Sequence, residues 1–251
     1  MTHPAPPTGT SPTGTSPTET VTTGSHPRET GTTSTLMISA GGTAVAGREA
    51  AHRSFLELRR AVYVDEAGYL PPSDGTLETD QDDERSLAFG VVEDSPGGER
   101  VVAGLRLIVK GYAGSGGRRL PVETHWPDVF GACPAPAPSV EVSRLISRHP
   151  DRAVQHRHVL DLYATVLNFL DEAGLHVVYG LVDPVLERVL RSSLSVERIG
   201  ERRWVEHYRS ENVAIAITVP RLPRLSRWLP GRYATAAEIL VGRHTAEEAA
   251  A

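Results

Sequence analysis

Residues 149–193 constrain the fold more than any other part of the chain, because they predict a helix, a buried strand and a second helix in immediate succession. After His149-Pro150-Asp151, an apolar stripe at helical spacing runs until Gly174, a residue suited to the end of a helix. The stripe consists of Val159, Leu162, Tyr163, Val166 and Leu170. The nearly continuous apolar run at 176–182 is typical of a strand that is covered on both faces. Asp183-Pro184 then provides a helix N-cap and a proline at the first helical position, opening a helix to about Ser193.

The remaining segments predict further strands and one more helix. Apolar residues four, seven and eleven apart predict a helix over 47–66, which Gly68 ends. The expected strands lie at 36–40, 87–92, 101–109, 139–147, 204–207 and 213–219, and two pairs of them form hairpins. This order of elements predicts a mixed α/β (α+β) domain, with a sheet that carries helices on both faces.

Composition limits the domain to the middle of the chain. Residues 1–35 are almost wholly Thr, Pro, Gly and Ser, and such a segment is expected to be disordered because it has too little apolar surface to bury. We expect one domain at 36–219 and a tail at 220–251 that forms a peripheral helix or is disordered.

Charge and cysteine content argue against several classes of protein. The formal net charge of -5 gives no support to nucleic-acid binding. Neither a secretory leader nor an apolar run long enough for a transmembrane segment is recognisable, and Cys133 is the only cysteine, so a cytoplasmic location is expected. The scattered histidines lack the spacing of metal ligands, and no metal site is predicted.

Two charged motifs in unusual places are candidates for function. The acidic run at 78–84 is either a solvated surface or a cluster whose Asp80 and Asp83 turn inward to meet basic partners or a cationic substrate. In the strand at 140–144, alternation places Glu141 and Ser143 on one face and Val142 and Arg144 on the other. That strand either lies at a wet edge of the sheet or presents Glu141 to a cleft as a general base.

Arginines occupy apolar settings elsewhere in the chain. Arg106 lies within the expected strand at 101–109, and Arg59 lies within the expected helix at 47–66. Buried guanidinium groups need carboxylate partners, so these arginines and the acidic residues are expected to pair and to brace a site.

Taken in order, five motifs resemble those of the acyl-homoserine lactone (autoinducer) synthases. The motifs are Leu58-Arg59-Arg60-Ala61-Val62-Tyr63, Gly68-Tyr69, Glu78-Thr79-Asp80-Gln81-Asp82-Asp83, Gly104-Leu105-Arg106-Leu107 and Val140-Glu141-Val142-Ser143-Arg144. The similarity continues through 186–190 to 199–200, so the expected acyltransferase domain covers about 36–219. The resemblance implies the fold of the GCN5-related N-acyltransferases, a mixed, mostly antiparallel sheet that is splayed at its centre, where the pantetheine arm of a thioester enters.

The family's activity is implied along with its fold. Its members move an acyl group from an acyl carrier protein or coenzyme A to the amine of S-adenosylmethionine, and lactone closure releases methylthioadenosine and the acyl-homoserine lactone signal. No permanently bound cofactor is implied; the acyl-thioester and S-adenosylmethionine are substrates, and acyl carrier protein is a candidate partner.

Roles for individual residues are carried over from the family motifs. Glu141 would be the base and Ser143 would orient it, with oxyanion donors expected among the backbone N–H groups of 142–146. The S-adenosylmethionine side would be shaped by Arg59, Tyr63, Tyr69, Asp80 and Asp83. Arg106 and Arg144 would hold the acidic residues. Candidate contacts for a carrier protein or coenzyme A phosphates are Arg148, Arg152 and Arg157, for which solvation at the surface is the alternative.

Two departures from the family pattern affect the acceptor. Tyr69 stands where the family has Trp, and Asp82 stands where it has an aromatic residue. The related N-acyl amino acid synthases use the same scaffold with an amino acid as acceptor and are the enzymatic alternative. A catalytically inactive domain that binds an acyl-thioester or a protein is the third alternative.

Overall fold

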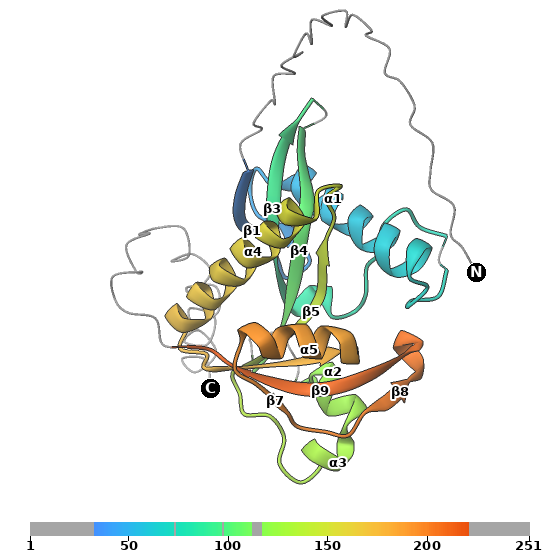
Figure 1. The fold of residues 1–251 in the computed structure, drawn as a ribbon, viewed down its shortest axis with the longest axis vertical. Coiled ribbons are helices and arrows are strands. Elements are labelled where there is room, and N and C mark those ends of the chain that lie inside the picture. Colours follow the sequence, from blue (N-terminus) through green and yellow to red (C-terminus); the bar gives the residue numbers. More distant parts are fainter. Residues whose placement is uncertain (1–32, 73, 97, 112–116, 221–251) are drawn as a thin grey trace, which may run out of the picture. The chain divides into compact units, whose positions relative to one another are not determined.

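The computed structural model describes residues 33–72, 74–96, 98–111 and 117–220 (Figure 1). In chain order its elements are β1 (Thr33–Ala40), β2 (Thr43–Ala44), α1 (Glu49–Arg59), the π-helix η1 (Arg60–Glu66), the 3-10 helix η2 (Asp83–Arg85), β3 (Ser86–Ser95), β4 (Gly98–Lys110), α2 (Pro121–His125), α3 (Pro127–Phe130), β5 (Ser139–Ser147), α4 (Arg152–Glu172), β6 (Val177–Val182), α5 (Pro184–Ser193), β7 (Val196–Arg198), β8 (Arg203–Val205), the 3-10 helix η3 (Glu206–Tyr208) and β9 (Ser210–Thr218).

The sheet is mixed and mostly antiparallel, as expected. Its strand order is β2-β1-β3-β4-β5-β6-β9-β7, and β8 pairs with β9. Only β5 and β6 are parallel among the strand pairs of the described residues. The long connection through α4 makes this parallel pair possible, because parallel neighbours need a crossover.

The predicted N-caps of two helices are confirmed, because a cap depends only on residues close by in the chain. The Asp151 carboxylate accepts from the backbone N–H groups of Ala153 and Val154, and Asp183 caps α5 in the same way. The helix predicted at 47–66 is present, but its second half widens into the π-helix η1 before Gly68, which has a φ of 63°. No helix in the described ranges combines the length and the apolar character that a bilayer crossing requires.

Some boundaries move, and six short elements were not predicted. The strand predicted at 204–207 ends at Val205, because residues 206–208 form the 3-10 helix η3. β1 begins at Thr33 instead of Leu36, because Thr33, Ser34 and Thr35 pair with β3. The rest of the predicted arm and the tail from residue 221 lie outside the described residues. The unpredicted elements β2, η2, α2, α3, β7 and η3 have two to five residues each, too few to show a period.

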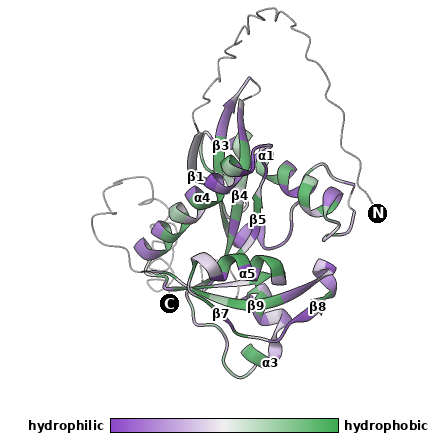
Figure 2. Ribbon diagram, in the orientation of Figure 1, coloured by the Kyte–Doolittle hydropathy of each residue, from purple (hydrophilic) through white to green (hydrophobic). Residues whose placement is uncertain are grey.

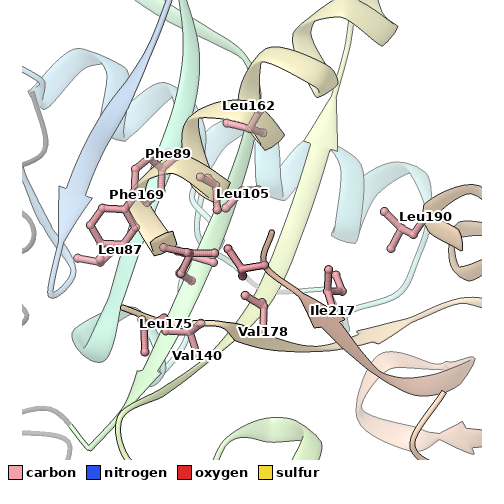
Figure 3. Close-up of a cluster of buried hydrophobic side chains, with 14 of the residues drawn as sticks. Leu87, Phe89, Leu105, Val140, Leu162, Phe169, Leu175, Val178, Leu190 and Ile217 are labelled. Atoms are coloured by element: carbon pink, nitrogen blue, oxygen red, sulfur yellow. The ribbon is translucent and has the colours of Figure 1, made fainter. Parts of the chain in front are cut away.

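Helices cover both faces of the sheet. On one face, α4 and α5 bury an apolar core that includes Leu162, Phe169 and Leu190, with Phe89 and Leu105 of the sheet below them (Figure 3). The opposite face packs against α1 near Phe55 and against α2 and α3 near Trp126 and Phe130. Figure 2 shows hydrophobic stretches within β4 and β9 and a hydrophilic stretch within β5, whose sequence includes Glu141, Ser143 and Arg144.

The sheet divides at β5 and β6. The two strands pair only from Val140 to Val142 and from Val178 to Gly180. Beyond that point β6 continues with β9, while β5 continues with β4, and Figure 1 shows β4 and β5 running away from β9. The sheet therefore opens along the C-terminal half of β5.

Substituting Gly104 is expected to disturb the packing of α1 on the sheet. A Cβ at Gly104 in β4 would lie 2.6 Å from Cε2 of Phe55, a buried ring of α1. We expect Gly104→Ala to lower the free energy of unfolding by about 1–3 kcal/mol, the usual cost of overpacking a core. Chemical denaturation measures it, and Gly75→Ala, whose new Cβ has its nearest neighbour at 3.6 Å, serves as the control. Equal stability of the two variants would contradict this packing.

Candidate active site

Three arginines and three carboxylates form a buried cluster on the α1 side of the sheet. Arg106 Nη1 lies 2.6 Å from Asp80 Oδ1 and 2.8 Å from Asp83 Oδ1. Arg59 pairs with Asp83, at 2.7 Å, and with Glu78. Arg144 Nη2 lies 2.9 Å from Glu78 Oε1 and 3.0 Å from Asp80 Oδ2. The acidic residues thus turn inward to basic partners, as one of the two sequence interpretations held.

The charges of this cluster compensate one another. Burial alone raises the pKa of Asp80, but Arg106 and Arg144 outweigh burial and hold that pKa well below its ordinary value. Burial likewise opposes the change at the other two carboxylates, but Arg144 and Arg59 lower the pKa of Glu78. Arg59 and Arg106 lower the pKa of Asp83. The three positive and three negative charges of the cluster largely cancel. The cluster therefore holds α1, β4, β5 and the loop at 78–83 together and has little net charge with which to attract a charged ligand.

The prediction that Arg144 faces away from Ser143 is wrong. Arg144 has a φ of 52°, and the register of β4 against β5 shifts between Arg106 and Gly104. Two residues of β5, Arg144 and Leu145, therefore stand opposite Leu105, which is a β-bulge. The bulge turns the Arg144 guanidinium to the side where Arg106 and Ser143 lie, and the ion pairs with Glu78 and Asp80 stabilise the strained backbone.

Glu141 is buried and stands apart from the cluster. Its Oε2 accepts a hydrogen bond of 2.8 Å from the backbone N–H of Val122 in α2. Among the described residues no cation forms an ion pair with it, and burial raises its pKa to about 8. A carboxyl group with such a pKa exchanges a proton near neutral pH, as a general base must.

Ser143 does not orient Glu141 through a hydrogen bond. Its Oγ instead accepts from Arg106 Nε at 3.0 Å, which ties β5 to the cluster. Ser143 is therefore a link between the strand that carries Glu141 and the arginine that holds Asp80.

Two cavities meet where the sheet opens. The first, of about 90 Å³, is apolar and lies between the diverging strands, α4 and α5. Its walls include Val142, Val166, Leu170, Val182, Leu190 and Ile217. The second, of about 210 Å³, is more polar and is lined by Glu141, Ser143 and Arg144. Both cavities share wall residues on β5, β6 and α5, so an apolar chain and a polar group can lie side by side at Glu141.

The two tyrosines predicted for the site line the polar cavity. Tyr63, on the π-helix, donates a hydrogen bond to the Leu145 carbonyl at 3.1 Å, and burial raises its pKa to about 12. The Arg144 guanidinium lies 5.3 Å from the centre of the Tyr63 ring, and the Tyr69 ring lies 6.2 Å from it. The wide turn of a π-helix, a frequent feature of functional sites, thus places an aromatic wall beside Arg144.

The three remaining predicted arginines are not part of this centre. Arg148 forms an exposed ion pair with Glu66. Arg152 and Arg157 are exposed at the start of α4, and neither of the two cavities is lined by any of the three.

Tyr208 is a site residue that the sequence patterns missed. It lies on η3, between β8 and β9, and lines the polar cavity together with Glu141. Burial, reinforced by the Glu141 carboxylate, raises the pKa of its hydroxyl. No period or motif marks Tyr208, because the short turn that carries it reaches Glu141 only through the tertiary fold. Among the described residues no group of acidic, histidine and cysteine side chains is arranged to hold a metal ion.

Comparison with known proteins gives similarity in structure only. No family model and no curated protein sequence matches the chain. The solved structure of BjaI, a CoA-dependent acyl-homoserine lactone synthase with SAM and isopentyl-CoA, matches with a TM-score of 0.57 at 18% identity, covering 83% of this chain and 90% of BjaI. TofI, in a ternary complex with an inhibitor and MTA, matches with a TM-score of 0.53 at 20% identity, covering 74% of this chain and 91% of TofI. FeeM, an N-acyl amino acid synthase from uncultured soil microbes, matches with a TM-score of 0.55 at 18% identity, covering 76% of this chain and 92% of FeeM. The chain therefore has the fold that acyl-homoserine lactone synthases share with an N-acyl amino acid synthase.

Proposed function

We propose that this chain is an N-acyltransferase that moves an acyl group from a thioester to the amine of S-adenosylmethionine and so makes an acyl-homoserine lactone. The observation that carries the proposal is Glu141, a buried carboxyl group with a pKa of about 8 that lines a polar cavity beside an apolar one. The five motifs and the shared fold support the same activity.

Each cavity has a part in this reaction. The apolar cavity accommodates the acyl chain, because most of its wall residues are Leu, Val and Ile. The thioester carbonyl then lies at the opening between β5 and β6, where β5 beyond Val142 has no ladder with β6. Backbone N–H groups on this edge are the proposed donors to the oxyanion.

The proton balance of the transfer assigns Glu141 its role. The acceptor amine attacks the carbonyl carbon, its proton passes to the Glu141 carboxylate directly or through water, and the thiolate departs when the tetrahedral intermediate collapses. In the second step the carboxylate of S-adenosylmethionine closes the lactone on its own side chain and expels methylthioadenosine. The compensated arginine cluster holds β5 and the loop at 78–83 in place during both steps.

The donor is an acyl-thioester of coenzyme A or of an acyl carrier protein. BjaI, which has the same fold, was solved with isopentyl-CoA. Arg148, Arg152 and Arg157 are proposed contacts for the phosphates of coenzyme A or for acidic residues of a carrier protein, since all three project from the surface after β5.

An amino acid acceptor is the second candidate. FeeM matches this chain about as well as BjaI does, and FeeM is an N-acyl amino acid synthase. Tyr69 and Asp82, which differ from the motifs of the acyl-homoserine lactone synthases, belong to the acceptor side of the site, and this supports a different acceptor.

Product analysis tests the proposed function. The protein is expressed in a bacterium that makes no acyl-homoserine lactones, and the extract is analysed by mass spectrometry. Acyl-homoserine lactones are the expected products, and N-acyl amino acids would replace the proposed acceptor. If purified protein supplied with S-adenosylmethionine, the amino acids and several acyl-thioesters gives neither product, the chain is a binding module and the proposal is wrong.

A further inference from the structure

Tyr208 carries a hydroxyl group that the proposed mechanism does not use. Its side chain lines the polar cavity that contains Glu141, Ser143 and Arg144. With the residues that the structure describes, the Tyr208 hydroxyl forms no hydrogen bond. A tyrosine inside a protein normally gives its hydroxyl a protein partner, since a polar group withdrawn from water without one costs free energy. The Tyr208 hydroxyl is therefore available to a ligand in the polar cavity.

Three other side-chain donors of the same cavity are already engaged by the protein. The Tyr63 hydroxyl and the Asn212 amide each donate to a backbone carbonyl, at 3.1 Å and 3.0 Å. The Arg144 guanidinium is held by two carboxylates of the arginine cluster. A ligand meets Tyr208, in contrast, as a donor that no described residue occupies.

Tyr208 and Glu141 reach the cavity from opposite sides of the split in the sheet. Glu141 lies on β5, whereas Tyr208 lies on η3, in the connection from β8 to β9, and β9 pairs with β6. Burial, reinforced by the Glu141 charge, raises the pKa of the Tyr208 hydroxyl, so this group keeps its proton near neutral pH. An acyl carbonyl at the split thus has a base on one side and a hydrogen-bond donor on the other.

Contacts of the Tyr208 ring fix the position of its hydroxyl. The ring lies edge-on to that of His207, with centroids 4.8 Å apart, and 5.6 Å from the ring of His125. The turn that carries Tyr208 ends at Arg209, whose φ of 48° is left-handed and costs free energy in a residue other than glycine. A donor that is held in place before the reaction stabilises developing charge better than one that must first reorient.

We propose that the Tyr208 hydroxyl donates a hydrogen bond to the carbonyl oxygen of the acyl-thioester and stabilises the negative charge that forms there when the amine attacks. The proton stays on the phenol oxygen throughout, and the backbone N–H groups of β5 donate to the same oxygen from the other wall. This role rests on the proposed function. It does not depend on which acceptor is used, since S-adenosylmethionine and an amino acid give the same oxyanion.

Tyr208→Phe tests the hydroxyl alone, because it keeps the ring and its contacts with the two histidines. With octanoyl-CoA and S-adenosylmethionine, kcat should fall about 10²-fold, the usual cost of one lost oxyanion donor, while KM changes little. The melting temperature should not fall, since the hydroxyl has no described protein partner to lose. The rise of kcat/KM with pH through about 8 should persist, because Glu141 is intact.

Two thioesters separate this role from protonation of the departing thiolate. An alkyl thiolate gains from a proton donor as it leaves, whereas a more acidic aryl thiolate leaves readily without one. Tyr208→Phe should therefore lower kcat by the same factor for octanoyl-pantetheine and for the octanoyl thioester of thiophenol. A loss confined to the alkyl thioester overturns the oxyanion role.

Tyr179→Phe is the matched control. Tyr179 pairs with Glu141 in the β5–β6 ladder, and its hydroxyl also forms no hydrogen bond with the described residues, but it lines neither of the two cavities. Its kcat should equal that of the wild type. Full activity of Tyr208→Phe, or an equal loss in Tyr179→Phe, overturns the role of Tyr208 and leaves the transferase intact. Wild-type protein that acylates neither S-adenosylmethionine nor any amino acid overturns the proposed function, and the role of Tyr208 with it.

Discussion

Glu141→Gln is expected to lower kcat for acyl transfer by about 10²-fold or more. The amide has the shape of the carboxyl group and its oxygen still accepts from the Val122 N–H, but it cannot take up the proton of the attacking amine. Release of free thiol from the acyl-thioester, followed in the presence of the acceptor, measures the rate. A variant with full activity would remove Glu141 from the mechanism.

The stability of Glu141→Gln should differ from that of the wild type in a way that depends on pH, and the pKa of Glu141 sets the direction of the difference. The pKa of Glu141 is raised to about 8 in the folded chain by burial, against about 4.5 when unfolded. Its contribution to stability is therefore fully present below pH 4.5 and is lost as pH rises to about 8. The amide does not titrate and has no such loss, so the variant should melt at the wild-type temperature near pH 4 and above it at pH 8. The wild-type kcat/KM should rise with pH through about 8, and the variant should lack this rise.

Glu123→Gln is the matched control for Glu141. Glu123 is also buried, but it pairs with Lys110 at 2.5 Å and accepts from two backbone N–H groups. Although burial opposes the change, these partners lower its pKa. Its substitution should reduce stability without the loss of kcat expected at Glu141, since Glu123 lines neither of the two cavities at the split.

Arg106→Met is expected to reduce the free energy of unfolding by about 3–5 kcal/mol, the usual cost of breaking a buried ion-pair network. Arg106 is 2% exposed and donates to Asp80, Asp83 and Ser143. Methionine fills much of the same space, so the cost comes mainly from two carboxylates that lose a counterion. Urea denaturation measures it, and a midpoint equal to that of the wild type would contradict the bracing role.

An exposed arginine on the same strand provides the control. Arg100 pairs with Glu93 at 3.1 Å, but its side chain is 63% exposed. Solvent screens such a pair, so Arg100→Met should change stability by no more than about 1 kcal/mol.

The stability that the arginine cluster contributes should fall as the pH is lowered, whereas the stability that Glu141 contributes falls as the pH is raised. The pKa values of Glu78, Asp80 and Asp83 are lowered by the arginines, so their stabilisation is present above the unfolded values near 4. It is lost as pH falls below them. The stability of Arg106→Met should therefore depend less steeply on pH below 4 than that of the wild type.

Local patterns predicted most of the elements of the domain. The carboxylates of Asp151 and Asp183 cap α4 and α5 as expected, and β5 has the predicted bounds of Ser139–Ser147. These features depend on residues within one or two turns of chain, which is the range over which periodicity and capping act. The sequence also predicted the two hairpin pairings, the resemblance to a family implied a mostly antiparallel sheet, and only the structure gave the full order of the strands.

The sequence by itself determined which charged side chains occupy apolar elements, and hence that Arg59, Arg106, Glu141 and the acidic run need partners. Only the tertiary structure decided how they pair. The bulge at Arg144 reverses the face that alternation predicts, because ion pairs to residues more than 60 positions away outweigh the local preference for regular strand. The tertiary structure likewise brings Tyr208 to the cavity that contains Glu141, since such contacts across the sheet depend on how β5, β6 and β9 diverge and leave no pattern in the sequence.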